Sequence, residues 1–551
     1  MKALFGHLVR PPVLWITLAL GLGLPILLAR ALYLMMSDAT SAEVAADGFV
    51  LSVIGAMGLT LGFIGLLMLA RLLLRYGGGT FSVARTVLDE ALHMKIAIVF
   101  IVLLLVIVPT LPFIADSADP LRYRVQGFLS YSMTVTVILL SLLTIFLACW
   151  TLSGEIENKQ IFSVATKPLS RWRYLLGKWV GIVVLNGILL FVASVGIYSY
   201  TMFLSQQQAT EEHDRIALDE EVLTARIAQR AKPSQPLEDV VRQRLEQLQR
   251  NDPDTIRRTG EQQAHELGVA NAGDNMVMEL GLQAIQQQMF EQVERQWRSV
   301  APMGATSFVF EGLEDAHRYS DFIQFRYHAR VTEEVPDGQI GVIIEINGQP
   351  SALNVVIGQT QVMPLPVELI QDGRIDLTIH NRSPQNPNAS RDITVVFDGS
   401  DGLEMLYRVD SFGPNFFRGV LANWIKLGFL AMLGLTAASF LGFPVASTFS
   451  LMIFIAAAAS PFLLETVGTY GAGPGLTGAV QGGMSSFSTM ISSTLQRFAQ
   501  YGPGSDIVDG RYFGWASVGG CLLWIGVIWT GGIGLVAALI FRNRELARVQ
   551  V

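Results

Sequence analysis

The sequence has little cysteine and little histidine, with 2 and 7 of them in 551 residues. Cys149 and Cys521 both lie in apolar runs, where they cannot staple a soluble region, and two thiols do not make a zinc site. His317, His328 and His380 fall in one region but lack the spacing of zinc ligands. We therefore expect packing roles for the cysteines, ordinary roles for the histidines, and no metal site.

Charged residues are also scarce and are unevenly distributed. They make up 15% of the chain against 51% hydrophobic residues, and the mean hydropathy is +0.42, a combination typical of membrane proteins. Residues 205–415 hold 33 of the 46 acidic and 18 of the 39 basic side chains, whereas the remainder holds 13 acidic and 21 basic ones. This acidic excess argues against nucleic acid as a partner, and the two blocks indicate two environments.

Signatures of catalysis and of nucleotide binding are missing as well. No Gly-x-x-x-x-Gly-Lys-Ser/Thr loop occurs, so we expect no segment that cradles ATP phosphates. The motif "FDGSDG" at 397–402 is not a hydrolase elbow and favours a tight turn over a calcium loop. The long apolar segments hold almost no ionisable side chains, which disfavours coupling to protons or sodium. We expect a chain that is not an enzyme and holds no cofactor of its own. The energy for its work is expected to come from another component.

Long apolar segments dominate what is present. A bilayer requires about 20 such residues per helix, and eight segments qualify: 13–35, 50–74, 96–115, 128–151, 180–203, 423–441, 446–465 and 514–541. With the N-terminus in the cytoplasm, 14 Lys and Arg residues fall on the cytoplasmic side and 5 in the short outer loops. We expect a multi-pass protein of the plasma (inner) membrane with both termini cytoplasmic and 205–415 extracytoplasmic.

The outer block has two patterns. Residues 205–302 are typical of helices, and 303–414 are typical of short strands, with Ile323, Phe325 and Tyr327 alternating with polar residues. Asn347-Gly348 is a strong hairpin signal. The fold class is therefore a polytopic all-α membrane protein of about eight transmembrane helices with an inserted extracytoplasmic α + β domain, made of a helical part and a β-sandwich or jelly roll.

An amphipathic segment precedes the third apolar run. In "FSVARTVLDEALHMK" (81–95) the apolar residues share one helical face and the polar residues share the other. The apolar set is Val83, Val87, Leu88, Ala91 and Leu92, and the polar set is Arg85, Asp89, Glu90 and His93. We expect a helix in the inner membrane interface; the alternative is a helix buried among its neighbours.

A strongly patterned basic segment, "SGEIENKQIFSVATKPLSRWRYLLGKW", covers 153–179. It predicts a short helix ended by Pro168, and a second helix capped by Ser170 that begins with Arg171 and Arg173. Trp172, Tyr174 and Trp179 match an aromatic belt. We interpret this segment, called the elbow below, as a docking element for a cytoplasmic partner; the alternative is an ordinary charged loop that obeys the positive-inside rule.

The elbow resembles the cytoplasmic loop of ABC-2 type transporter permeases, including the nitrous-oxide-reductase-maturation type. The matching residues are Glu155, Glu157, Thr166, Lys167, Pro168, Ser170, Arg171, Gly177 and Lys178. "ARTVLDEALHMK" resembles the connecting helix of that family, and "LIFRNREL" (539–546) resembles its C-terminal tail. The resemblance covers about 80–204 and 415–551, and leaves out the first two apolar segments and 205–415.

The resemblance implies a six-helix permease core that works with a separate ATPase subunit. It divides the chain into two extra helices (1–78), the first half of the core (79–204), the outer regions 205–302 and 303–414, and a second half (415–551) with an outer re-entrant or gate segment near 484–500. The implied coupling residues are Glu155, Glu157, Ile161, Phe162, Lys167, Pro168, Arg171 and Lys178; those of the connecting helix are Arg85, Glu90 and Lys95.

The implied function is that of a permease subunit, with a lean to export. ATP and Mg would be bound by the partner ATPase, and a second permease copy or a paralogue would complete the dimer in the lipid bilayer. The alternative is a membrane-anchored binding or mechanical-transmission module whose outer domain engages a protein or ligand of the cell envelope.

Overall fold

The structure is a computed structural model, and it describes most of the chain. The described residues are 24–27, 29–30, 33, 48–111, 120–157, 170–207, 212–266, 273–333, 335, 338–383, 393–397, 402–467 and 497–543. The chain divides into two compact units. One, called the membrane unit, comprises residues up to Thr224, Ser411–Leu463 and the chain from Ser492; the other, called the outer unit, comprises Ala225–Asp410 and Leu464–Ile491.

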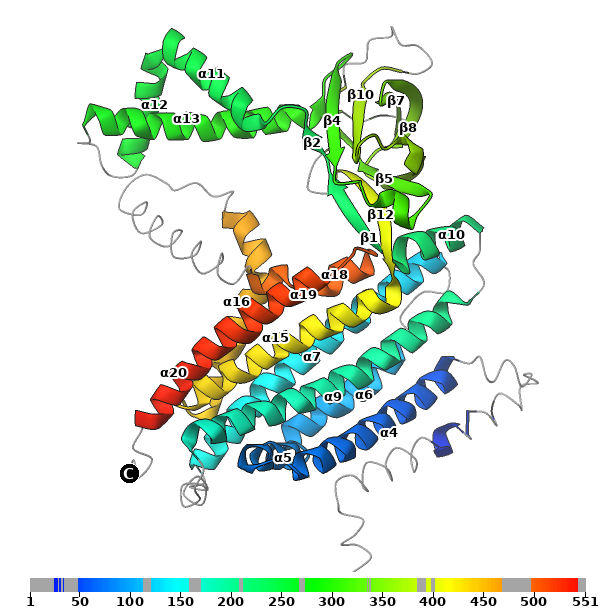
Figure 1. The fold of residues 1–551 in the computed structure, drawn as a ribbon, viewed down its shortest axis with the longest axis vertical. Helices are drawn as coiled ribbons and strands as arrows, with labels where there is room; N and C mark the ends of the chain where they lie inside the picture. The colour runs from blue at the N-terminus through cyan, green and yellow to red at the C-terminus, as the bar shows by residue number, and fades with distance from the viewer. Residues whose placement is uncertain are drawn as a thin grey trace, which may run out of the picture. The chain divides into compact units, whose positions relative to one another are not determined.

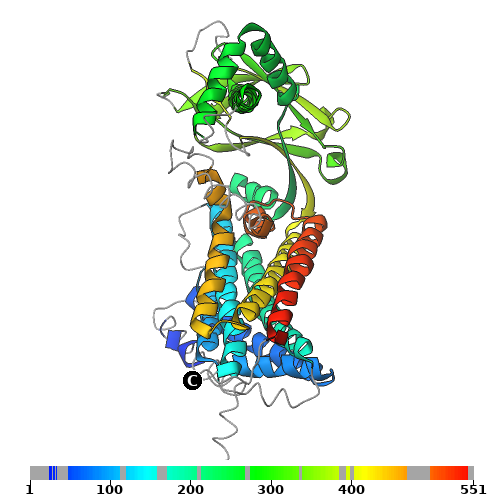
Figure 2. The same ribbon diagram turned by 90° about the vertical axis from the view of Figure 1, so that its left-hand side faces the viewer.

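Helices make up the membrane unit, and Figures 1 and 2 show them running alongside one another. Their bounds are α4 (Gly48–Arg75), α5 (Gly79–Ala91), α6 (Lys95–Thr110), α7 (Leu121–Glu157), α9 (Arg171–Ser205), α10 (Glu212–Ala217), η2 (Leu218–Val222), α15 (Phe412–Ala438), α16 (Phe443–Val467), α18 (Pro503–Val508), α19 (Trp515–Cys521), η4 (Leu522–Trp529) and α20 (Thr530–Asn543). Helices α7, α9 and α15 pack against one another around a core of Leu, Ile, Val, Ala and Phe side chains.

Six helices of the described residues are long and apolar enough to cross a membrane, so the chain has the build of a multi-pass membrane protein. They cover Ser52–Arg75, Leu121–Glu157, Arg171–Ser205, Phe412–Ala438, Phe443–Ser460 and Trp515–Ile540. A seventh span is possible where α5 and α6 join at a 76° bend. Of the eight predicted segments, 13–35 lies mostly outside the described residues, and 96–115 corresponds to α6, which has only 16 residues.

Two of these helices are much longer than a bilayer is thick. Helix α7 has 37 residues and α9 has 35, which at 1.5 Å per residue gives each a length of roughly 50–55 Å against a hydrocarbon core of about 30 Å. At least one end of each helix therefore projects well beyond the hydrocarbon. The end of α7 and the start of α9 flank the elbow.

The outer unit contains sheets and helices. Its strands are β1 (Thr224–Arg230), β2 (Lys232–Pro233), β3 (Ser299–Val300), β4 (Ala305–Glu311), β5 (Phe322–His328), β6 (Arg330–Val331), β7 (Gln339–Ile346), β8 (Gln349–Val356), β9 (Thr360–Pro366), β10 (Arg374–His380), β11 (Val395–Val396) and β12 (Leu403–Ser411). Its helices are α11 (Leu237–Asn251), α12 (Pro253–Glu266), α13 (Asp274–Trp297), α14 (Ala316–Tyr319) and η3 (Val367–Leu369). The predicted helical region thus also contains three short strands.

The strands form three sheets, ordered β1-β12-β5-β9, β2-β4-β10-β7-β8 and β3-β11-β6. Side chains of the two larger sheets share one core, in which the rings of Phe310 and Phe325 meet edge to face at 6.3 Å. The predicted alternation is confirmed, because Ile323, Phe325 and Tyr327 are all buried. The predicted hairpin is confirmed as well: Asn347 and Gly348, both with positive φ, join β7 to β8.

Candidate functional site

Three helices meet at a buried group of charges beside the elbow. Lys178 of α9 is fully buried, and its Nζ donates to Glu155 Oε1 of α7 at 2.8 Å and to Glu90 Oε2 of α5 at 3.1 Å. The carboxylate side chains keep only 18% and 28% of their surface exposed. Glu90, Glu155 and Lys178 are called the ion cluster below. A buried ammonium requires such partners, because desolvation of an unpaired charge costs several kcal/mol.

The ion cluster exists because α5 lies unusually close to α9. A Cβ on Gly177 would stand 2.7 Å from both the Thr80 carbonyl oxygen and Val83 Cβ. One turn further on, a Cβ on Gly181 would stand 2.7 Å from the Ala84 carbonyl oxygen. Small residues four apart are the usual device by which membrane helices approach closely. The Gly-Lys pair of the elbow motif therefore has a physical reason. Gly177 allows α5 to approach closely, and Lys178 binds the Glu90 carboxylate of α5.

The amphipathic helix α5 follows its predicted faces. Val87, Leu88 and Ala91 are buried, whereas Arg85 and His93 are exposed. A second ion pair anchors it, because Arg71 Nη2 of α4 lies 2.5 Å from Asp89 Oδ1. The contacts of α5 with α4 and α9 combine the two predicted alternatives: one face is buried among helices and the other is open.

The ion cluster carries one more negative than positive charge. Its three members contribute two carboxylates and one ammonium. Glu155 Oε2 is buried and accepts no hydrogen bond from the residues that the structure describes. An additional donor at this position would therefore find an acceptor already in place.

Both ends of the elbow are attached to the rest of the membrane unit. Glu155 lies two residues before the end of α7, and Lys178 lies in the second turn of α9. At the start of α9, Arg171 Nη1 donates to the Arg542 carbonyl oxygen of α20 at 2.9 Å, and Trp179 Nε1 donates to the Gly428 carbonyl oxygen of α15 at 2.7 Å. A displacement of the elbow would therefore act on several helices together.

The predicted site residues separate into three groups. The first is the ion cluster. The second group is exposed and takes no part in it: Glu157, Arg171, Arg85 and Lys95. Ile161, Phe162, Lys167 and Pro168 lie outside the described residues. Ser170 occupies the predicted N-cap position with an extended backbone, but its side chain makes no capping hydrogen bond.

Only one of the three residues predicted to form an aromatic belt is exposed. Trp172 is 41% exposed, whereas Tyr174 is buried, with its ring centroid 5.8 Å from Lys178 Nζ. Trp179 contributes a hydrogen bond between helices. Tyr174 and Lys178 are four residues apart in α9 and therefore share one helical face, which is buried. The aromatic composition of the segment did not reveal this.

A polar pair holds the chain that leads into the last spanning helix. Asn415 Nδ2 donates to the Arg511 carbonyl oxygen at 2.7 Å, and Asn415 Oδ1 accepts from the Phe513 amide at 2.8 Å. Arg418 Nε donates to the Phe513 carbonyl oxygen at 2.7 Å.

The predicted gate segment 484–500 is described only from 497, as a helical turn that leads to α18.

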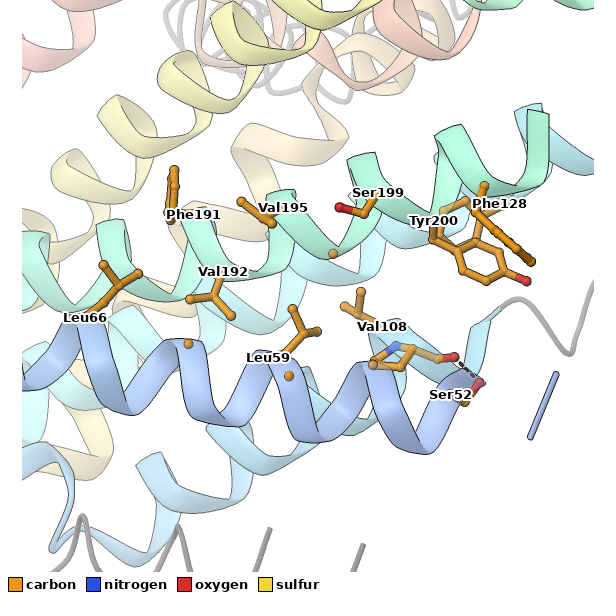
Figure 3. A pocket seen from close by; sticks show the side chains of 16 residues that line it. Ser52, Leu59, Leu66, Val108, Phe128, Phe191, Val192, Val195, Ser199 and Tyr200 are labelled. Atoms are coloured by element: carbon orange, nitrogen blue, oxygen red, sulfur yellow. Dashed lines mark hydrogen bonds between the residues drawn. The ribbon is translucent and has the colours of Figure 1, made fainter. Parts of the chain in front are cut away.

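A wide apolar cavity lies between α4 and α9. It measures about 640 Å³ and is lined by α4, α6, α7 and α9. Figure 3 shows Leu59 and Leu66 on one wall, Val192 and Val195 on the other, and the Phe128 and Tyr200 rings at one end. Glycines along α4 leave this space open, because a Cβ on Gly58 or Gly62 would meet nothing within 4 Å. The cavity offers room for hydrocarbon and no charged group.

The ion cluster is a set of buried ion pairs that links three helices. Its ammonium donates to both carboxylates, and no nucleophile with an adjacent base belongs to it. Among the residues that the structure describes, no three His, Cys, Asp or Glu side chains gather as a metal site would require. No family model, curated protein or solved structure matches the chain.

Proposed function

We propose that the chain is the membrane-spanning permease subunit of an ATP-binding-cassette transporter and acts in export. A separate cytoplasmic ATPase, which holds the ATP and Mg, binds the elbow and drives the permease through it. Two features of the sequence support this proposal: the elbow resembles the coupling loop of ABC-2 permeases, and the chain has no phosphate-binding loop of its own.

The ion cluster is the observation that carries the proposal. It joins the last turn of α7, the second turn of α9 and the helix α5, so both ends of the elbow are held by one buried lysine. A force applied to the elbow then moves three helices as one body, since separating them would leave charges unpaired in a poorly hydrated place. The close packing of α5 on α9 adds to this stiffness.

The exposed residues at the ends of the elbow are the expected contacts of the ATPase. Glu157 and Arg171 are both exposed, and neither contributes to the ion cluster. They present one negative and one positive side chain on the two sides of 158–169. Charges of both signs favour a specific orientation of a partner surface.

The test is co-purification of the chain with the ATPase encoded beside it. We expect the Glu157→Ala, Arg171→Ala double variant to lose most of the complex and of the ATPase stimulation. The matched control is Glu246→Ala with Arg250→Ala, which removes an exposed Glu–Arg pair from α11 in the outer unit. If the elbow variant and the control both keep full complex formation and full stimulation, the proposal is wrong.

A second candidate function places the activity in the outer unit, which would bind an envelope partner and transmit motion to it. The supporting observation is that this unit has its own core, and that its boundary strands β1 and β12 are neighbours in one sheet. Along the chain, β12 is followed at once by α15. Replacement of Ala225–Asp410 with a short Gly-Ser linker distinguishes the two candidate functions. An exporter keeps part of its transport, whereas a transmission device loses all function.

A further inference from the structure

A lysine near the middle of α15 has no counter-charge among the residues that the structure describes. Lys426 is half-buried in a helix that is long and apolar enough to cross a membrane. Among the described residues it makes no ion pair; its Nζ lies 4.3 Å from the centroid of the Phe498 ring. Ionisable residues inside membrane helices are costly and are retained for function.

Lys426 lines a cavity of about 400 Å³ in the membrane unit. Helices α7, α15 and α16 form its walls, together with residues 498–504. Most of the lining is apolar, as with Val137, Leu430 and Phe454, and its polar side chains besides the lysine are Thr134, Ser141 and Asn423. The volume lies in the range of sites for small ligands.

We propose that this cavity binds an amphiphile with an anionic headgroup, a carboxylate or a phosphate, which pairs with Lys426. Among the described residues of the lining, the lysine alone carries a full charge, and Asn423 and Thr134 supply hydrogen-bond donors beside it. The apolar walls receive the hydrocarbon part. A free hydrated anion would exchange its water for one ammonium and a largely apolar surface, an exchange that costs more than it returns.

This assignment is independent of coupling to an ATPase, because binding is measured on the chain alone. The probe is radiolabelled dodecyl phosphate, added to the purified chain in the neutral detergent dodecyl maltoside and followed by scintillation proximity. We expect saturable binding that Lys426→Gln weakens by about tenfold or more, the loss of one hydrogen bond to a charged group. Lys232→Gln, at an exposed lysine of the outer unit, is the matched control and keeps full affinity.

Competition on the unaltered chain provides a readout that does not depend on the folding of a variant. Dodecanol, which has the tail without the charge, and inorganic phosphate, which has the charge without the tail, are both expected to compete far more weakly than unlabelled dodecyl phosphate. Equal competition by dodecanol would show that no anion is recognised, and equal competition by inorganic phosphate would show a free-anion site. Either result, or unchanged affinity in Lys426→Gln, overturns the proposal.

Discussion

Lys178 and Lys426 lie in neighbouring helices of one unit and have opposite surroundings. Lys178 is fully buried between two carboxylates, whereas Lys426 is half-buried beside a cavity and an aromatic ring. Helix α5 makes the difference, because it brings Glu90 to Lys178 and no comparable acidic helix among the described residues reaches Lys426. The first lysine has its partners within the chain, and the second leaves room for a partner from outside.

The same contrast separates the helix contacts on the two sides of α9. On the α5 side, backbone and side-chain atoms of α5 occupy the space that a side chain on Gly177 or Gly181 would need. On the α4 side, glycines line an apolar cavity. Close packing therefore accompanies the paired lysine, and looser packing occurs away from it. Under the proposed function, a force on the elbow would reach α5 through its close contact with α9.

The largest effect is expected when the paired lysine is replaced. Lys178→Met leaves Glu90 and Glu155 without their cation and should lower the free energy of unfolding by about 3 kcal/mol, at the lower end for a broken buried pair because both carboxylates keep some exposure. Lys426→Met removes a charge that has no partner among the described residues and should be neutral or stabilising. Unfolding midpoints in detergent measure both. Equal midpoints for the two variants would contradict the comparison.

A smaller loss is expected from a single methyl group between α5 and α9. Gly177→Ala places a Cβ 2.7 Å from the Thr80 carbonyl oxygen, so α5 must move away, at a cost of about 1–3 kcal/mol. Gly62→Ala in α4 meets nothing within 4 Å and should gain up to about 1 kcal/mol of helix propensity. The two unfolding midpoints should therefore shift in opposite directions. Midpoints that shift in the same direction would show that the difference in packing does not affect stability.

Local patterns predicted much of this architecture. The faces of α5 and the Asn347-Gly348 hairpin depend on residues close in sequence, so periodicity and turn chemistry were sufficient. The pairing of Glu90 with Lys178 was not predictable in this way, because 88 residues separate them and their contact depends on the space left by Gly177. The resemblance named both residues but gave them separate roles.

Lys426 shows a signal that was present and overlooked. The expectation that the apolar segments hold almost no ionisable groups left this residue without comment, although 423–441 contains a lone cation. Arg418, eight residues earlier in α15, is buried and donates to the Phe513 carbonyl oxygen. A single charge in an apolar stretch indicates a partner, and only the fold could tell whether that partner belongs to the chain.

A further prediction concerns the contact between α9 and α15, the helices that carry the two lysines. Trp179 Nε1 of α9 donates to the Gly428 carbonyl oxygen, and Trp424 Nε1 of α15 donates in return to the Val183 carbonyl oxygen at 2.9 Å. Each Trp→Phe change removes one hydrogen bond and should lower the free energy of unfolding by about 1 kcal/mol. The double variant should show roughly the sum; a loss no larger than either single loss would mean that the two bonds break together.

The smallest effect is expected at a third lysine, Lys232, which shows what exposure does to a paired charge. It lies 2.8 Å from Glu311 Oε2, and both side chains are at least half exposed. The hydrogen bond from Lys232 lowers the pKa of the Glu311 carboxyl, so any stabilisation is present above the ordinary carboxyl pKa and is lost as the pH falls through the lowered value. Solvent screening leaves little of it. Lys232→Gln should therefore leave the unfolding midpoint unchanged at about pH 7 and about pH 3, and a loss at neutral pH that approaches that of Lys178→Met would show that burial is not what gives Lys178 its importance.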